Sequence, residues 1–481
     1  MNIFIMVINK PFRIVILGAG YAGMFLAINL YHSLKEASDD DRKGKNSSDD
    51  VEIILVDKNS YHQMLQEIHF VAAGYRTAAE ISIPITSLIY RTEIRFIQSN
   101  VKEIHAGEHK VILDGSIVDY DLVVICLGST TKYFDIKGAM TNTFPFRSVD
   151  DATLIHSKIQ SFSLSQSSQR SYVKDEMKKN DDNKKGSNGS NNIIIVGGGA
   201  TGVSLGGAIA DFLKDQANSK GRPNSLLSFK NNLKVTIVEA LPNILAGWNQ
   251  ELVNNARKIL ESKGVRILTN SEVSKIEHDN LILKNGSTIT SSLIIWTAGV
   301  KGYEIKVIPQ TDKTKDGRII VNGFCQVDNY PNIFVIGDIA AIKDNYGKIY
   351  PPIAQLAVRE AKYLADILLN CFGKLGRENT NIKNLITLKN RDVFDYDIKV
   401  QVISLGADDY VGIFGKHVIS GNLAKMIDEF GKLTYIRSIK TGGEDISSNL
   451  YEDSMISKLI AGFCFAGFAF AKWIGVEGFK K

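Results

Sequence analysis

The sequence predicts an α/β fold in which one structural unit occurs twice. A hydrophobic strand runs directly into a glycine-rich turn at Arg13–Gly23, "RIVILGAGYAG", and again at Ile193–Gly202, "IIIVGGGATG". Each turn precedes a helical segment, a polar insertion and a second strand that ends in an acid. These second strands are "IILVD", ending at Asp57, and "VTIVE", ending at Glu239. This order of elements is typical of a parallel sheet covered by helices.

The two units also close in the same way. Each ends with a further apolar strand and a glycine, "LVVICLG" to Gly128 and "LIIWTAG" to Gly299. The corresponding features of the two units are separated by nearly the same number of residues, which indicates an internal repeat.

Both turns have the spacing G-x-G-x-x-G. The first glycine permits the tight turn, the second lets the backbone approach a pyrophosphate, and the third lets the helix pack closely against the strand. The free N–H groups at the helix start attract phosphates, and the acid accepts hydrogen bonds from a ribose. We therefore expect two Rossmann-like dinucleotide-binding domains. The residues expected at the first nucleotide are Gly18, Gly20, Tyr21, Ala22, Gly23, Asp57, Lys58 and Gly128, and those at the second are Gly197, Gly199, Ala200, Thr201, Gly202, Glu239, Ala298 and Gly299.

Two dinucleotide sites in one chain imply electron transfer between two cofactors. A nicotinamide and a flavin form the obvious pair, because flavins accept hydride and release electrons singly or in pairs. We assign resident FAD to the first turn and NADH to the second. The carboxylate of Glu239 repels a 2′-phosphate, and the following "ALP" offers no Arg or Lys to bind one, so NADH is favoured over NADPH.

Composition limits the classes of protein that fit. A chain of 481 residues is too long for one core, so roughly two to four domains are expected. The net charge of +5 is too small and too dispersed to predict nucleic-acid binding. The four cysteines form no CxxC pair and no metal-ligand cluster occurs, so no metal is expected. The first ten residues lack the basic start and the cleavage site of an export signal.

Polar stretches and changes of pattern give the expected domain boundaries. Three stretches rich in Ser, Asn, Asp and Lys read as surface insertions, at Glu36–Asp50, Ser165–Asn192 and Asp215–Asn232. Beyond residue 394, "IKVQVISLG" and "LTYIRSIKTGG" read as strands of a small separate region. The expected parts are an FAD-binding domain at 11–160 and 306–394, a polar linker at 161–192, an NADH-binding domain at 193–305 and a C-terminal region at 395–481.

Motifs in the second half of the chain resemble those of a particular protein family. "PNIFVIGDIAA" ends in Gly337–Asp338 and resembles the second FAD fingerprint of flavoproteins with two dinucleotide-binding domains. "YPPIAQLAVREAKYLADIL" reads as a helix started by Pro351–Pro352, with Ala357, Ala361, Leu364 and Leu368 on one face. This helix is similar to that of type II NADH:quinone oxidoreductases, which carry A-Q-x-x-x-Q beside flavin and quinone. The segments "NSYHQMLQEIHFVAAG" and "IWTAGV" also resemble that family.

The resemblance adds site residues and shows two departures. It implies FAD contacts from His62, Gly337, Asp338, Ala354 and Gln355, and a catalytic role for Gln355. Arg359 is our second candidate for a catalytic residue. Arg359 stands where the family has the second glutamine; it either donates to a quinone oxygen or is a solvated helix residue. Ser204 stands where the family usually has glutamate, so a role for that acid is absent or relocated. His62 and His69 are expected to be hydrogen-bonded structural residues.

The C-terminal end predicts contact with a membrane. Leu459–Ala471 is apolar but shorter than the roughly 20 residues that span a bilayer, with Lys458 and Lys472 at its ends. We expect a helix at 455–476 to lie in the interface of the bilayer; the alternative is a dimer contact or a core helix.

The expected activity is FAD-dependent oxidation of NADH by a membrane quinone, without proton pumping. The expected location is the cytoplasmic face of the cell membrane, as a peripheral protein and with a homodimer as an option. The alternatives are a sulfide:quinone oxidoreductase, a soluble NADH-dependent reductase of ferredoxin or rubredoxin, and a redox-sensing flavoprotein without turnover. The first of these needs paired cysteines beside the flavin, which the spacing of Cys126, Cys325 and Cys371 does not suggest.

Overall fold

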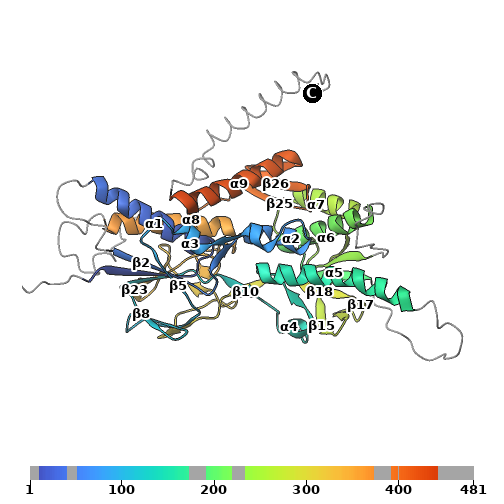
Figure 1. The fold of residues 1–481 in the computed structure, drawn as a ribbon, viewed down its shortest axis with the longest axis horizontal. Coiled ribbons are helices and arrows are strands. Elements are labelled where there is room, and N and C mark those ends of the chain that lie inside the picture. Colours follow the sequence, from blue (N-terminus) through green and yellow to red (C-terminus); the bar gives the residue numbers. More distant parts are fainter. Residues whose placement is uncertain are drawn as a thin grey trace, which may run out of the picture.

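The computed structural model describes residues 10–40, 51–172, 191–218, 233–372, 392–398 and 400–442. The described chain is built around two large sheets that lie side by side, and helix α9 (Asn422–Thr441) lies at the top of the molecule in Figure 1. No helix of this described part is long and apolar enough to cross a bilayer. The expected helix at 455–476 lies outside these residues.

The first sheet has six strands. Its strands are parallel except β22, and their order is β22 (Gln326–Val327), β23 (Tyr330–Val335), β9 (Leu122–Ile125), β1 (Phe12–Leu17), β2 (Val51–Asp57) and β5 (Arg95–Gln98). Helices α1 (Tyr21–Asp40) and α8 (Ala354–Phe372) pack together over it, on the left of Figure 1. The four residues Ala357, Ala361, Leu364 and Leu368 of α8 are all buried, which confirms the predicted apolar face.

The second sheet repeats the central part of the first. It is fully parallel, with the order β11 (Phe144–Pro145), β18 (Leu293–Trp296), β12 (Asn192–Val196), β13 (Lys234–Val238) and β14 (Arg266–Leu268). Its helices are α6 (Ala200–Asn218) and α7 (Gln250–Ser262). Strands β18, β12, β13 and β14 therefore correspond in order to β9, β1, β2 and β5, which confirms the internal repeat.

The repeat extends to the antiparallel strands that follow each unit. In the first unit these are β6 (Val101–His105), β7 (Lys110–Leu113) and β8 (Ile117–Asp119), and in the second β15 (Val273–Glu277), β16 (Asn280–Leu283) and β17 (Thr288–Thr290). Strand β20 (Lys306–Ile308) then pairs with β6, so the chain returns to the first unit after completing the second.

The two crossings between the units lie side by side. Strand β10 (Ser129–Thr131) leads out of the first unit and β19 (Val300–Gly302) leads back, and the two pair antiparallel. The remaining short elements are β3 (Tyr61–Gln63), η2 (Leu65–Glu67), α2 (Ile68–Ala72), η3 (Ala78–Ile81), β4 (Ser82–Pro84), α3 (Ile85–Leu88), α4 (Ala139–Asn142), β21 (Ile319–Ile320) and β24 (Ala340–Ala341).

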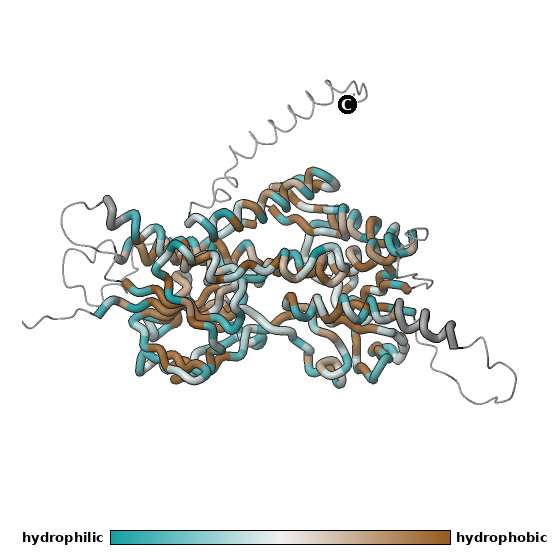
Figure 2. The backbone as a smooth tube through the Cα atoms, viewed as in Figure 1, coloured by the Kyte–Doolittle hydropathy of each residue, from teal (hydrophilic) through white to brown (hydrophobic). Residues whose placement is uncertain are grey.

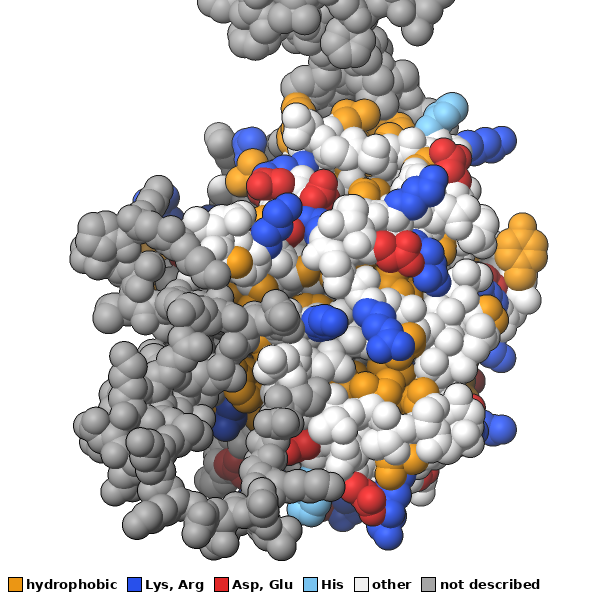
Figure 3. Space-filling model, turned by 90° about the vertical axis from the view of Figure 1, so that its right-hand side faces the viewer, with side chains coloured by type: hydrophobic (Ala, Val, Ile, Leu, Met, Phe, Trp, Pro, Cys, Tyr) orange, Lys and Arg blue, Asp and Glu red, His pale blue; other side chains and the backbone are white. Residues whose placement is uncertain are grey.

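The cores follow from the hydrophobic strands. Residues Ile14–Leu17 and Ile193–Ile195 are fully buried, as expected for parallel strands that are covered on both faces. Figure 2 shows the hydrophobic strands at the centre of each half, with mixed helices outside. Figure 3 shows the end formed by the second unit, where Lys and Arg side chains are interspersed with Asp and Glu.

Some boundaries differ from those expected. Strand β11 lies within 11–160 but pairs with β18 of the second sheet, and helix α5 (Val149–Tyr172) continues past residue 160 into the expected linker. Helices α1 and α6 likewise extend into the first residues of the polar stretches that follow them. Solvent-exposed polar residues are compatible with a helix once its earlier turns are packed, so composition alone placed these ends too early.

The described C-terminal residues form a small unit of three strands and one helix. Strands β25 (Val400–Ser404), β26 (Tyr410–Phe414) and β27 (His417–Ser420) form an antiparallel sheet, and α9 packs on it and on α1. The prediction of a strand in "LTYIRSIKTGG" is wrong, because residues 433–441 of this segment form the second half of α9. Its β-branched and aromatic residues favoured a strand, but burial of Tyr435 and Ile439 on one helical face prevailed.

Candidate functional site: two dinucleotide turns and helix α8

The first glycine turn joins β1 to α1. Gly18 has φ = +104°, and a Cβ there would lie 2.8 Å from the Cys126 carbonyl carbon. A Cβ at Gly23 would overlap the Gly18 carbonyl oxygen, so the helix can approach the turn this closely only with glycine. A Cβ at Gly20 would meet nothing within 4 Å. The second glycine thus borders open space, as a turn that admits a pyrophosphate requires.

The second turn, between β12 and α6, has the same geometry. Gly197 has φ = +110°, and its Cβ would press on the backbone of Ala298 at 2.8 Å. A Cβ at Gly202 would overlap the Gly197 carbonyl oxygen, while one at Gly199 would meet nothing within 4 Å. Gly128 and Gly299, which follow the corresponding strands β9 and β18, also share positive φ angles of 71° and 69°. Both turns therefore fit a dinucleotide, as the sequence predicts.

The two acids bond their turns in the same way. Asp57 Oδ2 accepts from the N–H of Ala19 at 2.7 Å, and Glu239 Oε2 accepts from the N–H of Gly198 at 2.5 Å. Each acid also accepts a second backbone N–H two residues further along. Burial raises the pKa of Asp57 above its ordinary value, against the effect of its backbone hydrogen bonds. Lys58 beside it is exposed.

The two turns differ in how open they are. Ala22 is buried and Tyr21 is half-buried, whereas Ala200 and Thr201 at the equivalent helix start are exposed. A covered turn suits a cofactor that stays bound, and an open one suits a nucleotide that binds and leaves. This difference agrees with FAD at the first turn and NADH at the second.

A polar cluster surrounds the predicted second FAD fingerprint. Ser129 Oγ donates to Asp338 Oδ2 at 2.6 Å, and Arg147 Nη2 lies 2.5 Å from Ser129 Oγ and 3.3 Å from Asp338 Oδ2. Gly337 has φ = +77° and lies against Ala22 of α1. The cluster therefore joins the first glycine turn, the outgoing β10 crossing and the end of β23. Sequence reasoning missed Ser129, although it directly follows the predicted Gly128, and Arg147, which belongs to a segment without a motif.

The two predicted catalytic residues on helix α8 both contact the side chain of Tyr396. Gln355 Nε2 donates to the Tyr396 hydroxyl at 3.1 Å, and the Arg359 guanidinium lies over the Tyr396 ring, 5.3 Å from its centroid. Arg359 is half-buried. A guanidinium on a ring contributes about 0.5–1 kcal/mol at an exposed site. Sequence reasoning missed Tyr396, and its signal was the aromatic pair in "VFDYD" within a polar stretch.

Glu360, the residue after Arg359, is buried, and its burial disfavours the ionised carboxylate. Its side chain accepts from the Gly337 N–H at 2.5 Å, and the residue is 4% exposed. Burial raises the pKa of Glu360 to about 8, and Asp338 contributes in the same direction. Because this pKa is higher in the folded than in the unfolded chain, the free energy of unfolding falls as the pH rises from the ordinary glutamate value through about 8.

We expect Glu360→Gln to raise the thermal unfolding midpoint near pH 9 and to change it much less near pH 5. The amide oxygen can still accept from Gly337, and the side chain no longer pays for a buried charge above its pKa. Calorimetry of both proteins at the two pH values measures this. The exposed Glu93→Gln is the control, and an equal shift of Glu360→Gln at both pH values would contradict the prediction.

Both histidines of the segment after Asp57 are buried, and both form hydrogen bonds. Nδ1 of His62 is 2.9 Å from the Ala19 carbonyl oxygen, and His69 Nε2 is 3.0 Å from Ser404 Oγ. Burial lowers the pKa of His62 to about 4 and that of His69 to about 3. Both side chains are therefore neutral at physiological pH, as the structural interpretation expects. His62 contacts the backbone of the first turn directly.

Ser204 fixes the C-terminal unit to α6. Its hydroxyl donates to the Ser404 carbonyl oxygen on β25 at 2.7 Å, and both residues are buried. This serine thus holds two units together. In the described part of the chain, no group of His, Cys, Asp and Glu could hold a metal ion.

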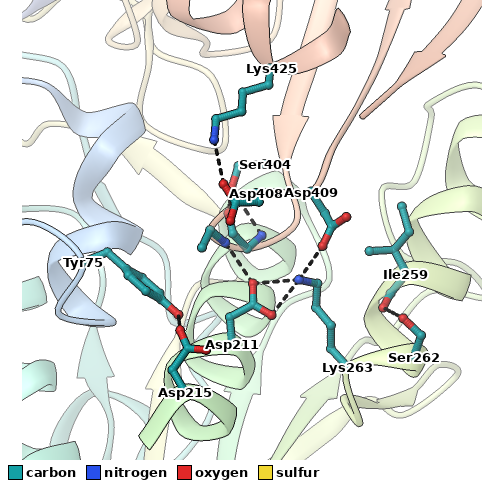
Figure 4. A network of polar contacts seen from close by, with 12 residues as sticks. Tyr75, Asp211, Asp215, Ile259, Ser262, Lys263, Ser404, Asp408, Asp409 and Lys425 are labelled. Carbon is teal, nitrogen blue, oxygen red and sulfur yellow. Dashed lines mark hydrogen bonds and ion pairs between the residues drawn. The ribbon is translucent and has the colours of Figure 1, made fainter. Parts of the chain in front are cut away.

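A polar network continues this contact toward the surface (Figure 4). Lys263 Nζ lies 2.6 Å from Asp211 Oδ1 on α6 and 2.7 Å from Asp409 Oδ2 before β26. The Tyr75 hydroxyl donates to Asp215 Oδ2 at 2.7 Å, from the first unit to α6. These bonds connect the first unit, the second unit and the C-terminal unit at helix α6.

Two dinucleotide turns of the same geometry, with the predicted FAD fingerprint and α8 on the first unit, fit a flavoprotein that binds two dinucleotides. Comparison with known families agrees: the model of the pyridine nucleotide-disulphide oxidoreductases matches residues 12–361. The chain belongs to this family.

The chain is also similar to individual curated proteins and to solved structures. A type II NADH:quinone oxidoreductase of Staphylococcus saprophyticus is 27% identical over 425 residues, covering 86% of this chain and 94% of the relative. The protein of that name from Staphylococcus aureus is 26% identical over 419 residues, covering 86% and 92%. NDH2 from Plasmodium falciparum in complex with NADH shares the fold with a TM-score of 0.69, at 17% identity over 89% of this chain and 95% of that one. The sulfide:quinone oxidoreductase of Aquifex aeolicus has a TM-score of 0.65, at 16% identity over 92% and 96%.

Proposed function

We propose that the chain oxidises NADH and reduces a membrane quinone with FAD as its resident cofactor, without pumping protons. The observation that carries this proposal is the pair of complete dinucleotide turns, one covered and one open. The similarity to curated type II NADH:quinone oxidoreductases over most of both chains supports it. Bound FAD would supply the redox chemistry, because a flavin can accept hydride from NADH and release two electrons to a quinone.

The residues of the chain bind and orient the reactants. The N–H groups at the starts of α1 and α6 receive the two pyrophosphates, and Asp57 and Glu239 receive the riboses. The N-terminal end of α8 carries a partial positive charge that favours a negative charge nearby. Gln355 and Arg359 lie on the first turns of this helix, where both contact Tyr396. We propose that Arg359 donates to a quinone oxygen from this position.

Anaerobic titration of the purified protein tests the activity. NADH is expected to bleach the flavin absorbance, and a soluble quinone analogue is expected to restore it. Bleaching by sulfide alone would favour a sulfide:quinone oxidoreductase. Two of the three cysteines that the structure describes, Cys126 and Cys325, argue against that outcome, because they are buried and burial raises the pKa of each thiol. Bleaching by NADH without recovery on any acceptor would favour a redox sensor.

We expect Arg359→Ala to slow oxidation of the reduced flavin by quinone and to leave its reduction by NADH unchanged. Loss of one charged donor to a developing anion costs about 100-fold or more in rate. Stopped-flow measurement separates the two half-reactions. Lys362→Ala, a change of a half-buried lysine on the same helix, is the matched control. Unchanged quinone kinetics in Arg359→Ala would refute the catalytic role.

We further propose that the protein lies on the cytoplasmic face of the cell membrane. The outer side of α9 exposes four apolar side chains at helical spacing, Leu423, Met426, Phe430 and Leu433. Such a stripe, followed in the chain by the apolar run Leu459–Ala471, suits a bilayer surface in which a quinone is dissolved. Flotation with vesicles before and after deletion from Met455 onward tests this. Loss of a dimer instead of loss of vesicle binding would assign the C-terminal end to a second copy.

A further inference from the structure

The backbone of Ala19 in the first turn is held by side chains at both its N–H and its carbonyl group. Its N–H donates to Asp57, and its carbonyl oxygen accepts from Nδ1 of His62 at 2.9 Å. Ala19 stands between Gly18 and Gly20, directly before the N–H groups that start α1. The orientation of the two peptide groups that flank the Ala19 Cα therefore sets the direction of the turn that the pyrophosphate would meet.

The second turn holds the equivalent carbonyl differently. The carbonyl oxygen of Gly198 accepts from the backbone N–H of Leu245 at 2.8 Å, within the same unit. In the first turn the donor is instead the side chain of His62, from β3. The two units thus share the acid and the glycines but differ in what fixes this carbonyl.

The bond to Ala19 determines the tautomer of His62. A carbonyl oxygen can only accept, so Nδ1 carries the proton and Nε2 of the neutral ring is an acceptor. The hydroxyl of Tyr435 lies 3.1 Å from Nε2 and donates to it. His62 is fully buried, so water does not compete for either nitrogen. The three groups form one chain of hydrogen bonds that runs from Tyr435 through His62 to Ala19.

Tyr435 comes from α9, in the C-terminal unit. Its residue is 8% exposed, and its ring lies 4.8 Å from that of Tyr21, the first residue of α1. One turn earlier on the same helix, Lys432 Nζ forms a buried ion pair with Glu67 at 2.6 Å. The helix is thereby fixed over the start of α1 in a position from which the hydroxyl reaches His62.

We propose that Tyr435 is a positioning residue for the flavin nucleotide. Its hydroxyl holds the His62 ring in the orientation from which Nδ1 fixes the Ala19 carbonyl, and so keeps the following N–H groups directed at the phosphates. This inference rests on the proposed function in that FAD occupies the first turn. The C-terminal unit then serves FAD retention, while the turn for NADH is fixed by Leu245 within its own unit.

Tyr435→Phe in the full chain tests the proposal, because it removes the hydroxyl and keeps the ring beside Tyr21. We expect FAD to dissociate about tenfold faster, the effect of one lost buried hydrogen bond, with NADH affinity unchanged. Release is followed by the rise of flavin fluorescence on dilution. After FAD is removed from both proteins, the amide hydrogen-exchange rates of Tyr435→Phe are expected to exceed those of the natural protein at residues 18–24 and to equal them at residues 197–203.

Two further variants separate positioning from general destabilisation. On a His62→Phe background, Tyr435→Phe is expected to add no further loss of FAD, because both changes interrupt the same chain of bonds. Tyr410→Phe alters another buried tyrosine of the same unit and is expected to leave FAD release unchanged. Additive effects of the two changes, or unchanged FAD release in Tyr435→Phe, would overturn the inference while the proposed function stands. A natural chain that takes up no FAD on reconstitution would overturn both.

Discussion

Gly202→Ala is expected to slow NADH oxidation strongly in a protein that still carries its flavin. A Cβ at this position would overlap the Gly197 carbonyl oxygen and would lie 2.7 Å from Thr297 Oγ1. Helix α6 must then move away from the turn, and the N–H groups that receive the pyrophosphate move with it. We expect kcat/KM for NADH to fall about 100-fold, equivalent to about 3 kcal/mol. Steady-state kinetics and the flavin content of the purified protein measure the two effects separately.

Gly199→Ala makes the same test without a clash inside the protein. Its Cβ meets nothing within 4 Å, so the fold and the thermal midpoint are expected to be unchanged, and only the space for the nucleotide is lost. We expect the KM for NADH to rise while dithionite still reduces the flavin. Gly107→Ala, in the turn between β6 and β7, also adds a Cβ to open space and serves as the control. Normal NADH oxidation by both variants of the second turn would show that NADH binds elsewhere.

Lys432→Met is expected to cause the largest loss of stability among changes to the C-terminal unit. The ammonium group has 7% side-chain exposure and contacts Glu67 at 2.6 Å, Glu429 at 2.7 Å and Asp428 at 2.9 Å. Removing one partner of a buried ion pair leaves the other charge uncompensated and costs about 3–5 kcal/mol. Arg76 still contacts Glu67 at 2.7 Å, so we expect a loss near the lower end, about 3 kcal/mol. Parallel denaturant transitions of the two proteins measure the difference.

Two comparisons test whether the buried charge is the cause. Glu67→Gln combined with Lys432→Met is expected to recover part of the loss, because the most buried of the three carboxylates is then no longer left without its partner. Lys425→Met removes a lysine of the same helix whose partner, Asp408, is exposed, and is expected to change the stability by less than about 1 kcal/mol. Similar losses in Lys425→Met and Lys432→Met would contradict this account.

The glycine turns, their strands and the two acids could be predicted from the sequence because their determinants are local. Strand, turn and helix start lie within a dozen residues, and the repeat of the pattern gave an internal check. The structure gives Gly18 and Gly197 the same positive φ and gives Asp57 and Glu239 the same bond to the turn. Helix α8 was predicted for a similar reason, from a proline start and an apolar face.

The residues that complete the site could not be predicted in this way. Tyr435 meets His62 across 373 residues, and Tyr396 meets Gln355 from a short polar segment. Such contacts depend on how α9 and the segment before β25 pack, which no periodicity within them reveals. The second half of α9 was itself misread, since its local preference for strand was weaker than the burial it gains against α1.

The pairing of β10 with β19 has a consequence for how such a chain could arise. The second unit leaves and rejoins the first at neighbouring strands, so its two ends are close together, as in a domain inserted into a loop of another. An insertion of this kind lets a duplicated copy change its ligand without disturbing the sheet of its host. The shared order of strands and the different fixing of the Ala19 and Gly198 carbonyls are what divergence after such an insertion would leave behind.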